Sequence, residues 1–362
     1  MTPGTSSAND VQAPPDRILV VGPAWVGDMV MAQSLFMTLK TRFPDVVIDV
    51  LAPRWSLPIL TRTPEVRRSV ELTVGPGQLG FIARRHLGHV LRRERYDQAI
   101  VLPLTAKSAL TPFFARIPRR TGYRGEMRYG LLNDVRTLDT NLLPGTVQRY
   151  VALGLPADAP LPPSTPYPRL TVRSDNQQDL MQRLGLTLER PVILLTPGAE
   201  FGPSRRWPLE RFAALARRLM ASGFQVWVDG SPKEFELGEH IRQAANCGVI
   251  NVCGRTSLED AIDLASLATT VVSNDSGLMH VASAVGTPVI GLFGPTSPSL
   301  APPLSTHRHM FYLDLPCSPC HKRECPLGHH KCLRDIEVDD VFRACAGDAG
   351  FQSVARVEEG DG

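Results

Sequence analysis

Short apolar runs alternate with helical patterns along most of this chain. Because strands that helices cover on both faces carry near-continuous apolar side chains, these runs predict parallel sheets with right-handed crossovers. The expected strands span residues 17–22, 46–51, 70–74, 98–102, 192–196, 225–228, 249–251, 270–273 and 288–292. The expected helices span residues 29–43, 81–94, 208–222, 234–244, 258–267 and 277–285. The pattern therefore predicts an α/β protein.

A proline-rich segment interrupts this alternation. Residues 156–168 contain six prolines and little periodicity, which is typical of a semi-rigid spacer between domains. A chain of 362 residues suits two hydrophobic cores, so we expect two doubly wound, Rossmann-like domains that face a central cleft. The predicted division is a disordered leader at 1–16, a first domain at 17–155, the linker at 156–168, a second domain at 169–345 and a tail at 346–362.

The composition narrows the class of protein further. A formal net charge of +3 with 21% charged residues does not indicate a nucleic-acid binder. The leader lacks the basic start and apolar core of a secretory signal, and no run of about 18 apolar residues could span a bilayer. We therefore expect a cytoplasmic protein that meets a membrane only peripherally.

Three loops follow predicted strands of the second domain, where ligands bind in folds of this kind. The first loop carries Gly198, Ser204, Arg205 and Arg206 just before a helix. Arginine suits phosphate because its planar fork donates two parallel hydrogen bonds and keeps its charge.

The second and third loops add complementary groups. Glu234 could accept hydrogen bonds from ribose hydroxyls. Asp275, Ser276 and Gly277 open a helix that also contains His280, and free N–H groups at a helix start hold anions such as a diphosphate. Together the three loops predict a nucleotide diphosphate on the second domain.

Each of these residues also has a purely structural interpretation. Asp275 or Ser276 could serve only as a helix N-cap, and Glu234 could cap the helix that follows it. Asp28, at the start of the first predicted helix, could be an N-cap as well. The pair Arg205 and Arg206 could form an ordinary solvated surface.

Two common nucleotide motifs are missing from the chain. The loop after the first strand is not GxGxxG, so it carries no dinucleotide fingerprint. No Asp-x-Asp occurs, so the carboxylate pair that bridges a metal to a nucleotide-sugar diphosphate is also absent. Charge on a leaving diphosphate would therefore have to be met by Arg205, Arg206 and backbone N–H groups.

Four ordered segments resemble the bacterial ADP-heptose:lipopolysaccharide heptosyltransferases, and the second enzyme of that pathway more than the first. These segments read GPAWVGDMVMAQSL, RTGYRGEMRYGLLNDVR, PGAEFGPSRRWP and SNDSGLMHVASA. The resemblance spans residues 17 to about 303. It implies the two-domain GT-B fold and inverting transfer, without a metal, of heptose from ADP-L-glycero-D-manno-heptose. The implied acceptor is Kdo-lipid A carrying one heptose, at the cytoplasmic face of the inner membrane.

The resemblance also implies roles for individual residues. Asp28 matches the catalytic base, and a single base on the acceptor side is what inversion by one displacement needs. Asp275, Ser276 and Gly277 match the donor-binding loop, and Glu234 matches the ribose-binding carboxylate. Arg205 stands where the family usually has a phosphate-binding lysine, and we expect it to hold the departing ADP.

The first domain is expected to bind the acceptor, whose carboxylates and phosphates favour basic residues. The candidates that fall in loop-like stretches near strand ends are Lys107, Arg120, Arg124 and Arg128. Other readings of the whole chain stay open at this point: the first heptosyltransferase of the pathway, a transferase for another nucleotide sugar, or a non-catalytic nucleotide-sugar binding protein in core assembly.

Four of the seven cysteines cluster near the end of the second domain. Cys317, Cys320, Cys325 and Cys332 lie beside two histidines with the spacing CxxCx4Cx6C, which resembles a small zinc or iron-sulfur site without matching a standard zinc ribbon. The alternative is a set of reduced thiols in a structured loop. Catalysis as described requires no cofactor.

Overall fold

The structure is a computed structural model that describes residues 14–75, 77–246 and 248–347. Most of the predicted leader, most of the predicted tail and Cys247 lie outside these described residues. None of the described helices is both long enough and apolar enough to cross a lipid bilayer.

The first half of the chain forms a six-stranded sheet in which all neighbouring strands are parallel. Its strands, in spatial order, are β3 (Val66–Glu71), β2 (Val47–Ala52), β1 (Arg17–Val21), β4 (Gln98–Val101), β5 (Arg119–Tyr123) and β6 (Asp134–Arg136). The strand order reverses between β1 and β4. A ligand of such a sheet lies beyond the carboxyl ends of the strands at this reversal.

The second half repeats this arrangement with another all-parallel sheet. Its strands, in spatial order, are β12 (Arg308–Phe311), β11 (Val289–Leu292), β10 (Thr270–Asn274), β7 (Val192–Thr196), β8 (Gln225–Val228) and β9 (Ile250–Asn251). Here the order reverses between β10 and β7. The loops after these two strands are the first and third loops that the sequence singled out.

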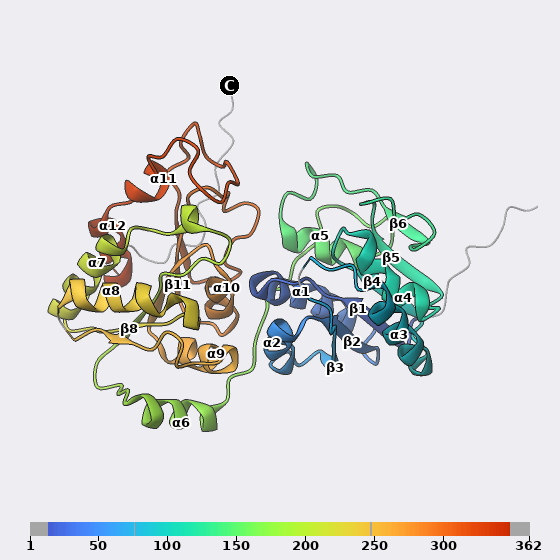
Figure 1. Ribbon diagram of the computed structural model, residues 1–362, viewed down its shortest axis with the longest axis horizontal. Helices are drawn as coiled ribbons and strands as arrows, with labels where there is room; N and C mark the ends of the chain where they lie inside the picture. Colours follow the sequence, from blue (N-terminus) through green and yellow to red (C-terminus); the bar gives the residue numbers. More distant parts are fainter. Residues whose placement is uncertain (1–13, 76, 247, 348–362) are drawn as a thin grey trace, which may run out of the picture.

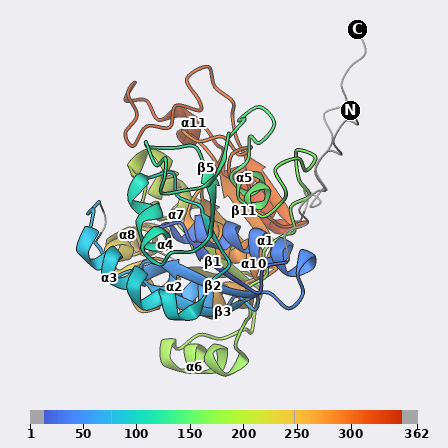
Figure 2. The same ribbon diagram turned by 90° about the vertical axis from the view of Figure 1, so that its right-hand side faces the viewer.

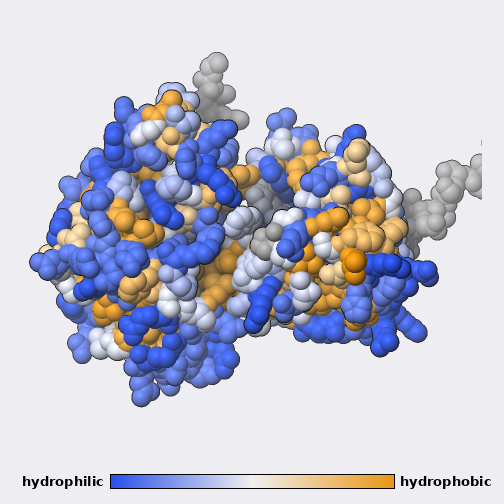
Figure 3. Space-filling view, viewed as in Figure 1, coloured by the Kyte–Doolittle hydropathy of each residue, from blue (hydrophilic) through white to orange (hydrophobic). Residues whose placement is uncertain are grey.

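Helices cover both sheets (Figure 1), and the apolar core of the first half extends to Ile262, Val281 and Ala284 of the second half, which also has a core of its own. The helices are α1 (Val26–Arg42), α2 (Leu57–Thr61), α3 (Phe81–Leu91), α4 (Leu110–Phe114), α5 (Thr146–Leu153), α6 (Ser174–Leu184), α7 (Leu209–Ala221), α8 (Phe235–Ala245), α9 (Leu258–Leu267), α10 (Gly277–Ala284), α11 (Lys331–Arg334) and α12 (Val338–Ala346). The predicted α/β fold with two doubly wound domains is confirmed. The space-filling view shows a hollow between the two halves (Figure 3).

One predicted strand was misplaced. The apolar run at residues 70–74 predicted the third strand, whereas β3 begins at Val66 and ends at Glu71. Arg67 and Arg68 are tolerated in this edge strand because both reach the buried carboxylate of Asp49 on the neighbouring strand. The apolar side chain of Val74 belongs instead to the loop after the strand, where it packs beneath Gly80.

The proline-rich segment runs along the first half before the chain enters the second. Ser34 of α1 donates a hydrogen bond to the carbonyl of Pro166 at 2.6 Å, and Gln33 donates to the carbonyl of Arg169 at 2.7 Å. We keep residues 156–168 as the proposed domain boundary.

The two halves are joined by a buried ion pair. Arg62, which follows α2, contacts Asp263 of α9 at 2.6 Å, and the two side chains are 5% and 0% exposed. Both oxygens of Asp263 accept from this guanidinium, and Asp263 also accepts from the backbone N–H of Arg173 at the entrance to α6. One carboxylate thus connects the first half to α9 and to the start of α6 in the second half.

Candidate active site

The N-terminal ends of α1 and α10 meet between the two halves of the molecule (Figures 1 and 2). Glycine is needed on both helices. A Cβ atom at Gly27 would lie 2.7 Å from the imidazole of His280, and one at Gly277 would lie 3.1 Å from the side chain of Val26. This close approach places Asp28, in the first turn of α1, beside the loop that precedes α10.

Asp28 has the electrostatic environment of a general base. Burial raises the pKa of its carboxyl to about 6; the charge of Asp275 contributes in the same direction, and the charge of Arg205 opposes them. Asp28 in turn helps to raise the pKa of the partly buried Tyr150, for which desolvation is the main cause. A base with a pKa near the working pH is partly free to accept a proton while remaining strong enough to remove one.

The first and third loops of the second half are held together by Asn274. Its side-chain amide donates to the carbonyl of Pro197 at 2.7 Å, and its side-chain oxygen accepts from the backbone N–H of Trp207 at 3.0 Å. Asn274 is fully buried. Both ends of the loop that carries Arg205 and Arg206 are therefore fixed to the end of β10.

Asp275 is engaged by side chains rather than by the start of α10. It forms a 3.0 Å ion pair with Arg205 and accepts a 2.5 Å hydrogen bond from the hydroxyl of Thr296. Ser276 occupies the N-cap position without a capping hydrogen bond from its side chain, and its hydroxyl lies 3.2 Å from that of Ser273. The interpretation of these two residues as helix caps is therefore wrong for the side chains in this structure.

Thr296 was missed by the sequence reasoning. It lies in the loop after β11 and is 3% exposed. The strand at 288–292 was predicted, so a polar residue in the loop that follows its carboxyl end was the signal that could have identified it.

Arg205 is oriented from a second side as well. Its guanidinium lies over the ring of Phe201 at 4.0 Å, a geometry in which the ring attracts the cation. Arg206 lies next to it, and the buried Nε atoms of both arginines lack a hydrogen-bond partner within the described part of the chain. These two side chains therefore retain donors for an anion.

Ser204 faces away from this cation pair. Its hydroxyl donates to the carbonyl of Lys322 at 2.6 Å, and its backbone N–H donates to the carbonyl of Arg323. In this structure Ser204 thus secures the loop to the cysteine-rich segment, a contact that does not favour the donor-binding role predicted for it.

Glu234 brings the second loop against the first. Its carboxylate accepts from the backbone N–H of Ser231 at 2.7 Å in a capping box of the 3₁₀ turn Pro232–Glu234, whereas its side chain makes no capping hydrogen bond to α8, the helix that follows. The same carboxylate also lies directly over Gly198, where any side chain would overlap with it. The capping contact and a ribose contact are compatible because a carboxylate accepts up to about four hydrogen bonds.

Two further buried groups border these loops. Asp229 follows β8 and accepts a 2.7 Å hydrogen bond from Thr256, and burial raises its pKa to about 7. Burial lowers the pKa of His280 to about 4, so this imidazole is neutral at pH 7. The Nδ1 atom of His280 is buried without a partner among the described residues.

The four predicted acceptor residues fall into two pairs. Arg120 donates to the carbonyls of Leu131 and Ile117, both at 2.6 Å, and Arg128, which is 2% exposed, donates to the carbonyls of Tyr123 and Pro103. Their guanidinium groups thus stabilise the main chain and have few N–H donors left for a ligand.

Lys107 and Arg124 are the more accessible pair. Lys107 lies in the 3₁₀ turn after β4 and is half-buried, whereas Arg124 follows β5 and is exposed. Arg124 donates to the hydroxyl of Tyr129 at 3.0 Å. Both lie beyond the carboxyl ends of strands, at the edge of the sheet that also leads to Asp28.

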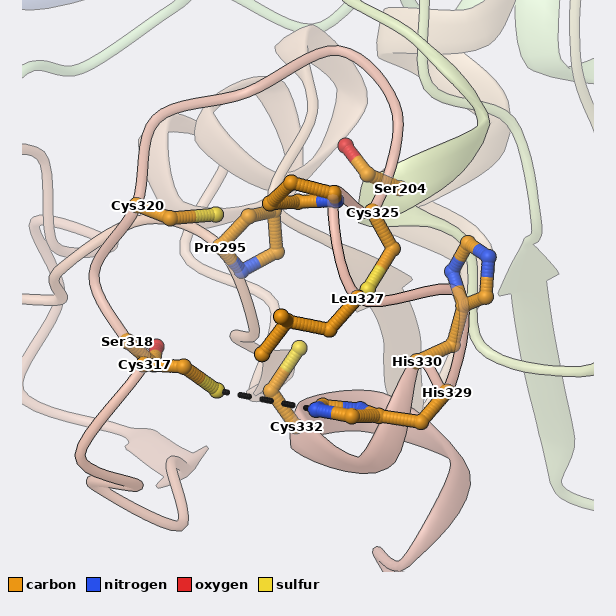
Figure 4. Close-up of a pocket in the computed structure, with 11 residues that line it drawn as sticks. Ser204, Pro295, Cys317, Ser318, Cys320, Cys325, Leu327, His329, His330 and Cys332 are labelled. Carbon is orange, nitrogen blue, oxygen red and sulfur yellow. Dashed lines mark hydrogen bonds between the residues drawn. The ribbon is translucent and has the colours of Figure 1, made fainter.

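The predicted metal site is not supported. Cys317, Cys320, Cys325 and Cys332 do line one pocket together with His329 (Figure 4). However, across residues 14–75, 77–246 and 248–347 no group of three or more His, Cys, Asp or Glu side chains is placed to hold an ion. Leu327 and Pro295 form part of the same pocket wall, and the sulfur of Cys317 is 4.0 Å from His329 Nε2.

The alternative of reduced thiols in a structured loop agrees with the geometry. All four cysteines are free. Burial raises the pKa of Cys332, and the neighbouring Cys317, Cys320 and Cys325 raise it further. The segment is attached to the loop after β7 through Ser204, and to the loop after β11 through the backbone hydrogen bond from His321 to the carbonyl of Pro295 at 2.8 Å.

Comparisons with known proteins agree with this architecture. The family model described as glycosyltransferase family 9 (heptosyltransferase) matches residues 84–331. The lipopolysaccharide heptosyltransferase 2 of Salmonella typhimurium is 46% identical over 335 residues, which are 90% of this chain and 96% of the relative. The lipooligosaccharide heptosyltransferase 2 of Haemophilus influenzae is 44% identical over 334 residues, covering 88% and 95% of the two chains.

A solved structure shows the same arrangement of both halves. The Escherichia coli ADP-heptose lps heptosyltransferase II superimposes with a TM-score of 0.80 at 42% identity, over 91% of this chain and 98% of that one. With the two doubly wound sheets and the helix contact at Asp28, these matches show that the chain belongs to glycosyltransferase family 9, the heptosyltransferases, and has the GT-B fold.

Proposed function

We propose that this protein transfers L-glycero-D-manno-heptose from ADP-heptose to the first heptose of the lipopolysaccharide inner core, with inversion at the anomeric carbon. The observation that carries the proposal is the convergence of Asp28 with Asp275 and Arg205, which links a base on the first half to an anion-binding loop on the second. Similarity to heptosyltransferase 2 proteins over 90% of the chain supports the choice of donor and acceptor.

In the proposed reaction Asp28 removes the proton from the attacking hydroxyl of the acceptor. The acceptor oxygen then forms a bond to the anomeric carbon on the face opposite the diphosphate, while the bond from that carbon to the ADP oxygen breaks. Asp28 keeps the proton, and the bonding electrons leave with ADP. One base on one face is sufficient for an inverting displacement.

Charge on the departing ADP is met by protein groups. Arg205 is held by Asp275 and Phe201 so that its guanidinium lies next to Asp28, and Arg206 lies beside it. The free N–H groups at the start of α10 add the positive end of its helix dipole. Groups that are fixed before the reaction stabilise developing charge without a cost for reorganising them.

The remaining residues are assigned binding roles according to the loop or helix in which they lie. Glu234 binds the ribose hydroxyls over Gly198, and Gly277 allows the diphosphate to approach the backbone. His280 packs behind this loop, against Gly27. For the acceptor we retain Lys107 and Arg124, because Arg120 and Arg128 are occupied by the main chain. The acceptor is Kdo-lipid A carrying one heptose, which the protein meets peripherally at the cytoplasmic face of the inner membrane.

The test is transfer from ADP-heptose to two acceptors: lipopolysaccharide truncated after its first heptose and core that lacks heptose. We expect transfer only to the first. Transfer only to the heptose-free core would reassign the protein to the first step of the pathway. Stronger competition by UDP than by ADP would indicate another nucleotide sugar, and donor binding without turnover on either acceptor would indicate a binding protein.

A further inference from the structure

The helix α3 has a solvent face on which apolar and basic side chains alternate. Its buried face consists of Arg84, Gly88 and Leu91. On the opposite face Ile82 is 83% exposed, and Phe81, at the start of the helix beside the buried face, is 46% exposed. The exposed basic side chains of this face are Arg85, His86 and His89. Figures 1 and 2 place α3 on the outer side of the first half, away from the second half.

Aromatic rings extend this face onto α4. The ring of Phe81 packs edge-on against Phe114 with 5.4 Å between centroids, and Phe113 packs against Phe114 at 5.5 Å. Phe113 is itself 40% exposed. Figure 3 shows hydrophobic side chains on this half of the molecule, bordered by hydrophilic ones. We call the surface formed by Phe81, Ile82, Arg85, His86, His89, Phe113 and Arg116 the α3–α4 face.

The charge on this face has a single sign. Desolvation and the nearby charges of Arg92, Arg85, Arg116 and His86 all lower the pKa of the exposed His89, so these basic groups lie close together. Among the residues that the structure describes, neither Arg85 nor Arg116 has a carboxylate within salt-bridge distance. The arginines of β3, by contrast, are paired with Asp49 and Glu94.

We propose that the α3–α4 face docks the protein onto an anionic lipid bilayer. A surface that combines unpaired basic groups with exposed aliphatic and aromatic side chains matches both layers of such a membrane: the basic groups meet lipid phosphates, and the apolar groups enter the region of the acyl chains. The phosphates of a nucleic acid would also attract the basic groups of this face. However, the most exposed of its large apolar side chains is Ile82, an aliphatic group that cannot stack on bases.

The position of this face suits a lipid-borne acceptor, and in this respect the inference rests on the proposed function. The start of α3 follows β3 and therefore lies at the carboxyl edge of the first sheet. Asp28 follows β1 and lies at the same edge. Docking through the α3–α4 face would bring the base toward sugars that extend from the membrane surface.

The experiment is flotation of the full-length protein with vesicles of phosphatidylcholine, with and without phosphatidylglycerol. We expect binding only to vesicles that contain the anionic lipid. The double variant Ile82→Ser/Arg85→Glu should lower this binding about tenfold or more, since each basic residue near the surface contributes and the substitution reverses one charge. Both side chains are exposed, so the fold should be retained.

The matched control is Leu188→Ser/Arg190→Glu, which makes the same chemical change at exposed positions of the second half. It should bind vesicles like the unmodified protein. Transfer to a delipidated, water-soluble acceptor should be equal for all three proteins, which separates docking from catalysis. The proposal is overturned if the unmodified protein does not float with anionic vesicles or if both double variants bind these vesicles equally well. It is also overturned if the protein binds an immobilised oligonucleotide but not the vesicles.

Discussion

At the scale of single residues, Asp28 is the group on which the proposed chemistry depends. Its carboxylate lies in the first turn of α1, where Asp275 and burial both oppose its ionisation. Asp28→Asn keeps the shape of the side chain and removes the base. We expect turnover to fall about 10²- to 10⁴-fold, while calorimetry shows ADP-heptose binding unchanged or slightly tighter. A variant that turns over like the unmodified enzyme would exclude Asp28 as the base.

The raised pKa of Asp28 predicts a particular pH dependence. The carboxylate form is the active one, so kcat should be half-maximal at about pH 6, become constant about one pH unit above that, and decrease by about tenfold per pH unit well below it. Rates with saturating acceptor between pH 4.5 and 8 would measure this. Arg205→Lys provides a contrast: Arg205 stabilises ionised Asp28, and lysine keeps the charge, so the midpoint should stay while kcat changes. A midpoint near 4 in the unmodified enzyme would contradict the burial argument.

At the scale of structural elements, the proposed donor site depends on loops that approach each other more closely than ordinary side chains permit. Gly198→Ala would place a methyl group inside the space occupied by the Glu234 carboxylate. Because Glu234 must then move away from the proposed ribose position, we expect the KM for ADP-heptose to rise about tenfold, with little change in the melting temperature.

A double-mutant cycle checks this interpretation. Glu234→Ala removes the carboxylate and its clash, so Gly198→Ala should have almost no additional effect in that background. Additive effects would show that Gly198 acts through something other than Glu234.

The sequence predicted those parts of the site that follow from the order of strands and loops. Strand ends are marked by apolar runs, so the loops that contain Gly198, Glu234 and Asp275 were located correctly. Contacts between side chains that are distant in sequence were not predictable. Nothing in the local pattern shows that Arg128 points into the main chain at Tyr123, or that Thr296 reaches Asp275.

The displaced strand β3 has a related cause. A run of apolar residues at 70–74 outweighed two arginines, because the partner of those arginines, Asp49, is on another strand. Pairing across the sheet therefore overrode the local signal. The cysteine spacing was similarly ambiguous, since spacing alone does not give the distances between sulfur atoms.

At the scale of the whole molecule, the Arg62–Asp263 pair joins the two halves. Arg62→Met leaves the buried carboxylate without its cation, so we expect the free energy of unfolding to fall by about 3–5 kcal/mol. Denaturant titration followed by fluorescence would measure this. If the two halves unfold in separate steps, the variant should also widen the interval between them.

The chain offers a matched control in the pair Arg173–Asp175, whose side chains are 62% and 66% exposed. Asp175→Asn should leave the free energy of unfolding nearly unchanged, because solvent screens exposed pairs. Equal losses in the two variants would show that the buried pair does not join the halves.

The contact between α1 and α10 and the Arg62–Asp263 pair are accompanied by apolar packing between the halves: the core around α1 includes Ile262 of α9 and Val281 of α10. Gly27 and His280 lie at the contact between α1 and α10, and Asp28 is adjacent. When one body turns against another, each atom moves in proportion to its distance from the axis of rotation. A swing that keeps this packing would therefore move the outer rim further than it moves Asp28 relative to the loop before α10.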